Sequence, residues 1–101
     1  MASNKLKNIR KKIGLLKQKL VSIGDMRPGT LTVQYRKPAE KEIPFNQISY
    51  TYKGKSRSEY VRPENLGSIK EEIEAYKLFK STINQIIELS IQASKLKSLP
   101  E

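Results

Sequence analysis

The chain has 101 residues and a formal net charge of +10, from 20 Lys and Arg against 10 Asp and Glu. It contains no Cys and no His, which excludes disulfides, thiolate zinc sites and catalysis by a thiol or an imidazole. A chain of this length forms one small domain with a thin core.

The charge is unevenly distributed along the chain. Residues 1–24 carry seven cations and no acid, residues 25–62 carry eight cations and four acids, and residues 63–101 carry five cations and six acids. This asymmetry favours a polyanionic partner for the first two segments. The alternative is that the basic surface only keeps a small protein in solution. No apolar run approaches the ~20 residues that span a membrane, so we expect a cytoplasmic protein with no membrane partner.

The first segment has the pattern of an amphipathic helix over about residues 3–23. Its apolar residues recur at intervals of three and four, which is the seam of a helix that packs along another helix: Leu6, Ile9, Ile13, Leu16, Leu20 and Ile23. The cations occupy the remaining faces. They either contact phosphate, or form a solvated face whose lysine stems shield the seam.

Residues 25–67 alternate apolar with polar side chains and are interrupted by turn residues, which predicts a three-stranded antiparallel sheet. Residues 30–36 form one strand and residues 46–62 a hairpin around Lys53 and Gly54. A three-residue loop, 52–54, is the register we prefer because it separates apolar from polar side chains. It places Ile48, Tyr50 and Tyr60 on one face, and on the other Gln47, Ser49, Thr51, Lys55, Arg57 and Glu59. A two-residue turn would instead pair Arg57 with Tyr50 and mix the faces.

Residues 68–101 predict a long C-terminal helix that starts at a capping box, Ser68 to Glu71. It carries two apolar stripes, which suggests two packing partners. The first stripe would cover the sheet: Ile69, Ile73, Tyr76, Ile83 and Ile87. The second would meet the N-terminal helix: Phe79, Ile86, Leu89, Ala93 and Leu96. The same seams could pair between subunits of a homodimer. The fold class is therefore α+β, and pairing of the two helices within one chain would make an antiparallel coiled coil.

No set of titratable residues has the pattern of a catalytic site. The acids Glu71, Glu72 and Glu74 lie near the start of the last helix, where the helix dipole favours them without any metal. We expect no enzyme activity, no cofactor and no metal.

Nucleic acid is the partner that the basic surfaces favour. A two-stranded ribbon fits the major groove of DNA, where Arg, Lys and Gln can bond base edges. The hairpin contacts would be Lys53, Lys55 and Arg57, with Gln47, Ser49 and Thr51 as polar base contacts. Phosphates would be held by Lys5, Arg10, Lys11, Lys12, Arg27, Arg36 and Lys37. Double-stranded DNA is favoured. RNA is the alternative, since tyrosines on a sheet stack with unpaired bases, although the preferred register buries Tyr50 and Tyr60.

Three stretches resemble a small prokaryotic domain family of uncharacterised activity whose members are often associated with mobile elements and transposases. They are MRPGTLTVQYR (residues 26–36), ISYTYKGKSRSEYVR (48–62) and IEAYKLF (73–79). The resemblance covers about residues 26–89 and includes the preceding basic helix. It implies a link to a mobile element, with nucleic acid or a mobile-element protein as the partner. Many members carry a Cys-rich segment after the Tyr-Arg pair, where this chain has KPAEKEI (37–43), so no metal is carried over.

A second hypothesis belongs to a different class. The helical seams would dock on a protein partner such as a nuclease, a transposase or a ribonucleoprotein subunit. Exposed cations at Lys55 and Arg57, continuous with Arg36, would favour nucleic acid. An exposed apolar surface along Leu89, Ala93 and Leu96 would favour the protein partner.

Overall fold

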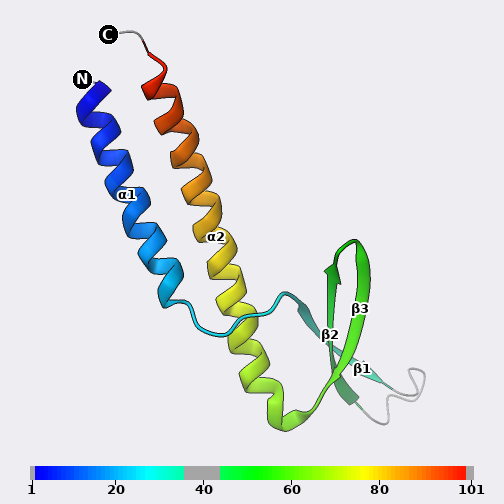
Figure 1. Cartoon of the computed structure of the whole chain (residues 1–101). Coiled ribbons are helices and arrows are strands. Elements are labelled where there is room, and N and C mark those ends of the chain that lie inside the picture. The colour runs from blue at the N-terminus through cyan, green and yellow to red at the C-terminus, as the bar shows by residue number, and fades with distance from the viewer. Residues whose placement is uncertain (1, 36–43, 100–101) are drawn as a thin grey trace. The chain divides into compact units, whose positions relative to one another are not determined.

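The computed structural model of the chain describes residues 2–35 and 44–99 and confirms the α+β class. Its elements, in order, are α1 (Ala2–Ser22), β1 (Thr30–Tyr35), β2 (Pro44–Tyr52), β3 (Lys55–Val61), the short 3-10 helix η1 (Pro63–Asn65) and α2 (Leu66–Lys97) (Figure 1). Two expected phosphate contacts, Arg36 and Lys37, lie outside the described residues, as does the segment 37–43.

The chain divides into two compact units, and α2 contributes to both. One, which we call the helical unit, comprises residues 1–24 and 78–101. The other, the sheet unit, comprises residues 25–77. The expected organisation into one domain with segments 1–24, 25–67 and 68–101 stays a prediction.

In the helical unit, α1 and the second part of α2 run side by side in opposite directions (Figure 1). The seam predicted for α1 is confirmed, because its six members are buried or half-buried while the residues between them are exposed. The facing positions on α2 follow the same spacing of three and four residues: Phe79, Thr82, Ile86, Leu89, Ala93 and Leu96. Thr82 is fully buried, and its hydroxyl donates to the carbonyl of Leu78 at 2.7 Å.

In the sheet unit, three antiparallel strands lie in the order β1-β2-β3. The core consists of Ile48, Val61 and Ile73, with Leu31, Leu66 and Ile69 packed against it. The first stripe of α2 therefore covers the sheet as expected at Ile69 and Ile73. It does not bury its whole length, because Ile87 belongs to the helical unit and is 51% exposed.

The segment that enters the sheet approaches the core closely. Gly29 has a φ of +153°, and a Cβ there would lie 2.5 Å from Cγ1 of Ile48. Two residues earlier, the backbone N–H of Arg27 donates to the carbonyl of Glu72 at 3.1 Å. Only glycine combines this backbone with this space, so position 29 fixes how the first strand meets Ile48.

The hairpin register that we preferred from the sequence is wrong. The turn has two residues, with Tyr52 paired to Lys55 and Tyr50 to Arg57. Lys53 and Gly54 have φ values of 51° and 77°, and positive φ at both central residues is the turn whose twist matches the strands. The turn geometry outweighs the separation of apolar from polar side chains.

The capping box is also wrong. Leu66 begins α2 directly after η1, so Ser68 lies inside the helix. Its hydroxyl lies 3.4 Å from a carboxylate oxygen of Glu72, one turn further on. Pro63 at the first position of η1 starts the helical path instead, because its fixed φ suits a helix start.

Candidate nucleic-acid interface

The charges separate strongly between the two units. The described residues of the helical unit carry one acid, Glu88, and ten cations: Lys5, Lys7, Arg10, Lys11, Lys12, Lys17, Lys19, Lys80, Lys95 and Lys97. Those of the sheet unit carry seven cations and six acids. The excess positive charge of the described chain therefore lies almost entirely on the helical unit.

The cations of α1 flank its seam on both sides. Lys5, Lys12 and Lys19 recur every seven residues on one flank, and Arg10 and Lys17 on the other. In an antiparallel pair, the flanks of one helix face the equivalent flanks of its partner. On α2 these positions hold no carboxylate; they are Gln85 and Gln92 on one side, and Ser90 and Lys97 on the other. All seven cations of α1 are exposed, and no acid of the described helical unit is placed to neutralise them.

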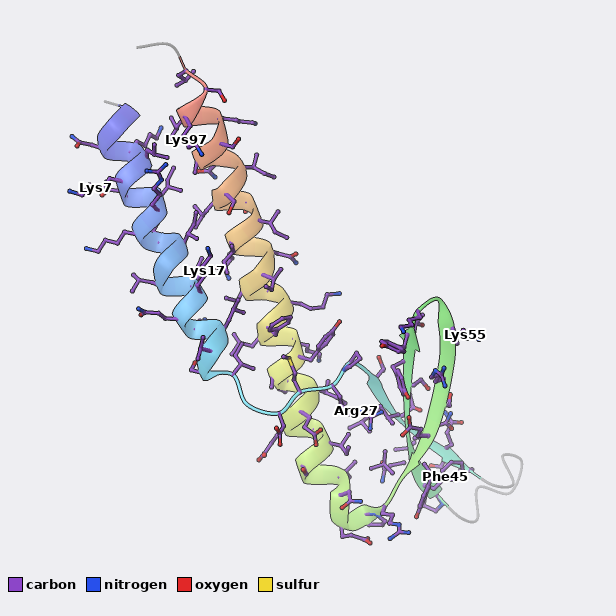
Figure 2. The ribbon with its side chains drawn as sticks, viewed as in Figure 1. Lys7, Lys17, Arg27, Phe45, Lys55 and Lys97 are labelled. Carbon is purple, nitrogen blue, oxygen red and sulfur yellow. The ribbon has the colours of Figure 1, made fainter. Side chains whose placement is uncertain are left out.

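A groove of about 350 Å³ opens between the two helices on the flank of Arg10 and Lys17. Lys97 and the hydroxyl-bearing residues Ser90 and Ser94 line it from α2. Its remaining lining is apolar or small: Ile13, Gly14 and Ala93. Figure 2 shows Lys17 and Lys97 on helix sides that border this gap, whereas Lys7 points away from α2. Three cations and two hydroxyls around one groove can hold an anion such as phosphate.

The corrected register divides the predicted hairpin contacts. Lys55 and Arg57 lie on the face of the sheet that carries Ile48 and Tyr50. The expected base contacts, Gln47, Ser49 and Thr51, lie on the opposite face. Lys53 lies in the turn, with its ammonium 5.4 Å from the centroid of the Tyr52 ring. The cations and the polar contacts of the hairpin therefore do not form one surface.

Arg27, an expected phosphate contact, belongs to a polar cluster inside the sheet unit. Its guanidinium lies 3.4 Å from Glu59 and 5.2 Å from the centroid of the Tyr50 ring. The Tyr50 hydroxyl donates to the same Glu59 carboxylate at 2.5 Å. This hydrogen bond is the main cause that lowers the pKa of Glu59 and raises the pKa of Tyr50. The positive charge of Arg27 lowers the pKa of Glu59 further. Arg27 is thus already partnered by a carboxylate.

The face of the sheet opposite to the core, which we call the open face, carries no charged residue in the described strands. It holds hydroxyl, amide and aromatic side chains only: Thr30, Thr32, Gln34, Phe45, Gln47, Ser49, Thr51, Ser56, Ser58 and Tyr60. The hydroxyls of Ser49 and Ser58 lie 3.3 Å apart across the strands.

Two aromatic rings lie together on the open face. The centroids of Phe45 and Tyr60 are 6.2 Å apart and the rings are inclined by 50°. Tyr60 is 59% exposed. The expectation that Tyr60 is buried was wrong, because the two-residue turn places Tyr60 on the face opposite to Ile48. Gly54 suits either turn, and Lys53 takes a positive φ that lysine does not favour, so no local sequence signal separated the two registers.

Among residues 2–35 and 44–99, no three His, Cys, Asp or Glu side chains gather where they could hold a metal ion. Within the same residues, no helix has the length and apolar character that crossing a membrane requires. The comparisons with known proteins give no relative, because no family model, no curated protein and no solved structure matches the chain.

Proposed function

We propose that the protein binds nucleic acid through its phosphate backbone, with the cationic flanks of the helical unit as the main contact. The observation that supports this proposal most is the ratio of ten cations to one acid on the described helical unit. Cations beside acids neutralise each other within a protein. The seven cations of α1 face no carboxylate on α2 among the described residues, so they retain their attraction for an external polyanion.

The mechanism is the release of condensed counterions. Each phosphate that is neutralised by a Lys or Arg frees cations from the nucleic acid, so affinity falls steeply with salt. The 21 residues of α1 give a helix about 31 Å long, which is long enough to follow several phosphates. Phe79, the one aromatic residue of the described helical unit, lies in the seam and is half-buried. No aromatic side chain of the described helical unit is therefore fully exposed for stacking with a base. The contacts of this unit are made to the phosphate backbone, and they do not depend on base sequence.

The test is the salt dependence of binding to duplex DNA, single-stranded DNA and RNA of equal charge. We expect log Kobs to fall linearly with log salt for the wild-type protein. The variant Arg10→Gln/Lys17→Gln/Lys97→Gln removes the three cations of the groove, and the slope should fall by about 2–3, since each phosphate contact contributes about 0.9. Binding that is insensitive to salt, or equal in the variant, contradicts the proposal.

A protein partner is the second candidate, and exposed apolar residues on the helices support it. Ile87 and Ile91 on α2 are 51% and 52% exposed, and Val21 on α1 is 87% exposed. The surface first expected for this role is not the exposed one, because Ala93 is buried and Leu89 and Leu96 are half-buried in the seam facing α1. The seams lie within one unit of this chain, and a homodimer through them stays a prediction.

A substitution distinguishes the protein partner from the nucleic acid. The variant Ile87→Gln/Ile91→Gln should leave the affinity for nucleic acid unchanged. It should abolish self-association, measured by sedimentation, or capture of a protein partner, measured by pull-down. An equal loss of nucleic-acid binding would show that these residues belong to the first interface. The link to mobile elements and the cytoplasmic location stay predictions from the sequence.

A further inference from the structure

We infer that the open face of the sheet binds unpaired nucleobases, so that the protein recognises nucleic acid with a single-stranded stretch. This inference rests on the proposed function and adds a second surface of different chemistry. The phosphates would be held by the cations, and the bases would stack on Tyr60 beside Phe45.

The chemistry of the open face suits bases and does not suit phosphates. Its ten described residues include no charge in a chain of net charge +10. A surface without cations has nothing to neutralise a phosphate. The amide of Gln47 and the hydroxyls around it are instead both donors and acceptors, which is what the edges of unpaired bases require.

Tyr60 has the exposure and the support that a stacking platform needs. It is 59% exposed, yet it stands directly opposite Gln47 in the sheet and beside the Phe45 ring. The tilted contact with Phe45 restricts the tyrosine ring from one side. A ring that is held in place and still accessible stacks with a base at a smaller loss of conformational freedom.

Another protein surface fits this face less well. A protein interface is apolar and aromatic at its centre, and apart from Phe45 and Tyr60 the open face is made of Ser, Thr and Gln. An acidic peptide would find no cation among the ten described residues of the open face, because Lys55 and Arg57 lie on the other face. Unpaired bases match both features of the face, the aromatic pair and the neutral polar side chains that surround it.

The experiment compares single strands of equal length and charge that differ only in their bases. One DNA strand carries bases throughout, a second is abasic over its central part, and an RNA strand of the same sequence forms a third arm. We expect the base-bearing strands to bind wild-type protein more tightly than the abasic strand. Tyr60→Ala should weaken binding of the base-bearing strands roughly tenfold or more and leave the abasic strand unchanged. The two base-bearing arms show whether DNA, RNA or both are bound.

Two variants make the tyrosine test specific. Tyr60→Phe keeps the ring and should bind within about threefold of the wild type, because stacking does not need the hydroxyl. Tyr52 is a matched control, since it is 54% exposed on the same hairpin but lies on the other face. Tyr52→Ala should have no effect that depends on bases. An equal loss with Tyr52→Ala would overturn the assignment to the open face.

A fluorescence readout does not depend on affinity. The chain contains no Trp, so Tyr60→Trp introduces a single probe. Base-bearing strands should quench it and the abasic strand should not, whereas Tyr52→Trp should respond to neither. Binding of base-bearing and abasic strands with equal affinity and equal quenching would overturn the inference while the proposed function stands. Absence of salt-dependent binding to every strand would overturn both.

Discussion

The described residues of the helical unit and of the sheet unit hold ten and seven cations, but the numbers of acids that accompany them differ strongly. In the sheet unit, seven described cations are accompanied by six acids, and Arg27 and Lys77 lie within 3.4 Å of Glu59 and Glu74 respectively. Among the described residues of the helical unit, ten cations are accompanied by Glu88 alone. Positive charge in the sheet unit is therefore nearly balanced by acids of the same unit, whereas the seven cations of α1 are exposed and face no carboxylate on the described part of α2. The comparison shows that the net charge of a chain indicates a partner only after its distribution in space is known.

Two glycines provide the largest expected contrast between the units. Gly29→Ala should destabilise the sheet unit by about 2–4 kcal/mol, because the new Cβ would overlap Ile48 and the backbone has positive φ. Gly14→Ala should stabilise the helical unit by up to ~1 kcal/mol, because alanine favours helix and nothing lies within 4 Å of its Cβ. Urea unfolding followed by circular dichroism measures both changes. Equal and small effects would contradict the packing described at Gly29.

The second contrast concerns binding, and it uses two triple variants that remove the same charge. Arg10→Gln/Lys11→Gln/Lys12→Gln should weaken binding to nucleic acid by about 10- to 100-fold at moderate salt, because three phosphate contacts are lost. Lys53→Gln/Lys55→Gln/Arg57→Gln should weaken it by less than about fivefold, the general effect of net charge. Fluorescence anisotropy with a labelled duplex measures both.

This pair of variants also tests the original hairpin hypothesis. If the hairpin variant lost more affinity than the α1 variant, the hairpin would be the main contact and the helical unit would serve only as a supporting charge. Melting curves of both variants provide the control for folding, and we expect little change because all six side chains are exposed.

The smallest effect concerns the cluster of Arg27, Tyr50 and Glu59. The pKa of Glu59 is lowered in the folded protein, so its contribution to stability is present above its unfolded pKa and lost as pH falls through the lowered value. The pKa of Tyr50 is raised, so its contribution is lost at alkaline pH, as pH rises through the raised value. Glu59→Gln should therefore lower the melting temperature slightly near neutral pH and not at all in strong acid. A difference that persists unchanged in strong acid would show that the carboxylate charge is not involved.

The helices could be predicted closely from the sequence, whereas the faces of the sheet could not. The seam of α1 is set by local periodicity from Leu6 to Ile23, the residue directly after the helix, and burial follows it over residues 4–23. On β3, residues 55–60 are all exposed and burial begins at Val61. Without burial near the turn, nothing requires the hairpin to separate apolar from polar residues, and the Lys53-Gly54 turn determines the register. The observed turn is one residue shorter than the expected loop. This difference places Lys55, Arg57 and Tyr60 on the faces opposite to those expected.

The cations on α1 could be predicted from the sequence, whereas the contacts that depend on tertiary structure could not. The cations of α1 could be identified from the sequence because seven of them precede the first acid, and all seven are exposed. The involvement of Arg27 with Glu59 depends on a contact between residues 32 positions apart, which local patterns do not contain. Lys97 and the groove depend on how α1 meets α2, which also requires the fold.

The most direct test of the central claim is a chemical-shift titration of the isotope-labelled protein with a short DNA duplex that has no unpaired bases. We predict that the amide signals of residues 2–22 and 78–97 shift most, that the shifts diminish with added salt, and that residues 44–61 shift little. Dominant shifts in the hairpin, with α1 unchanged, would contradict the assignment of the phosphate-binding surface to the helical unit.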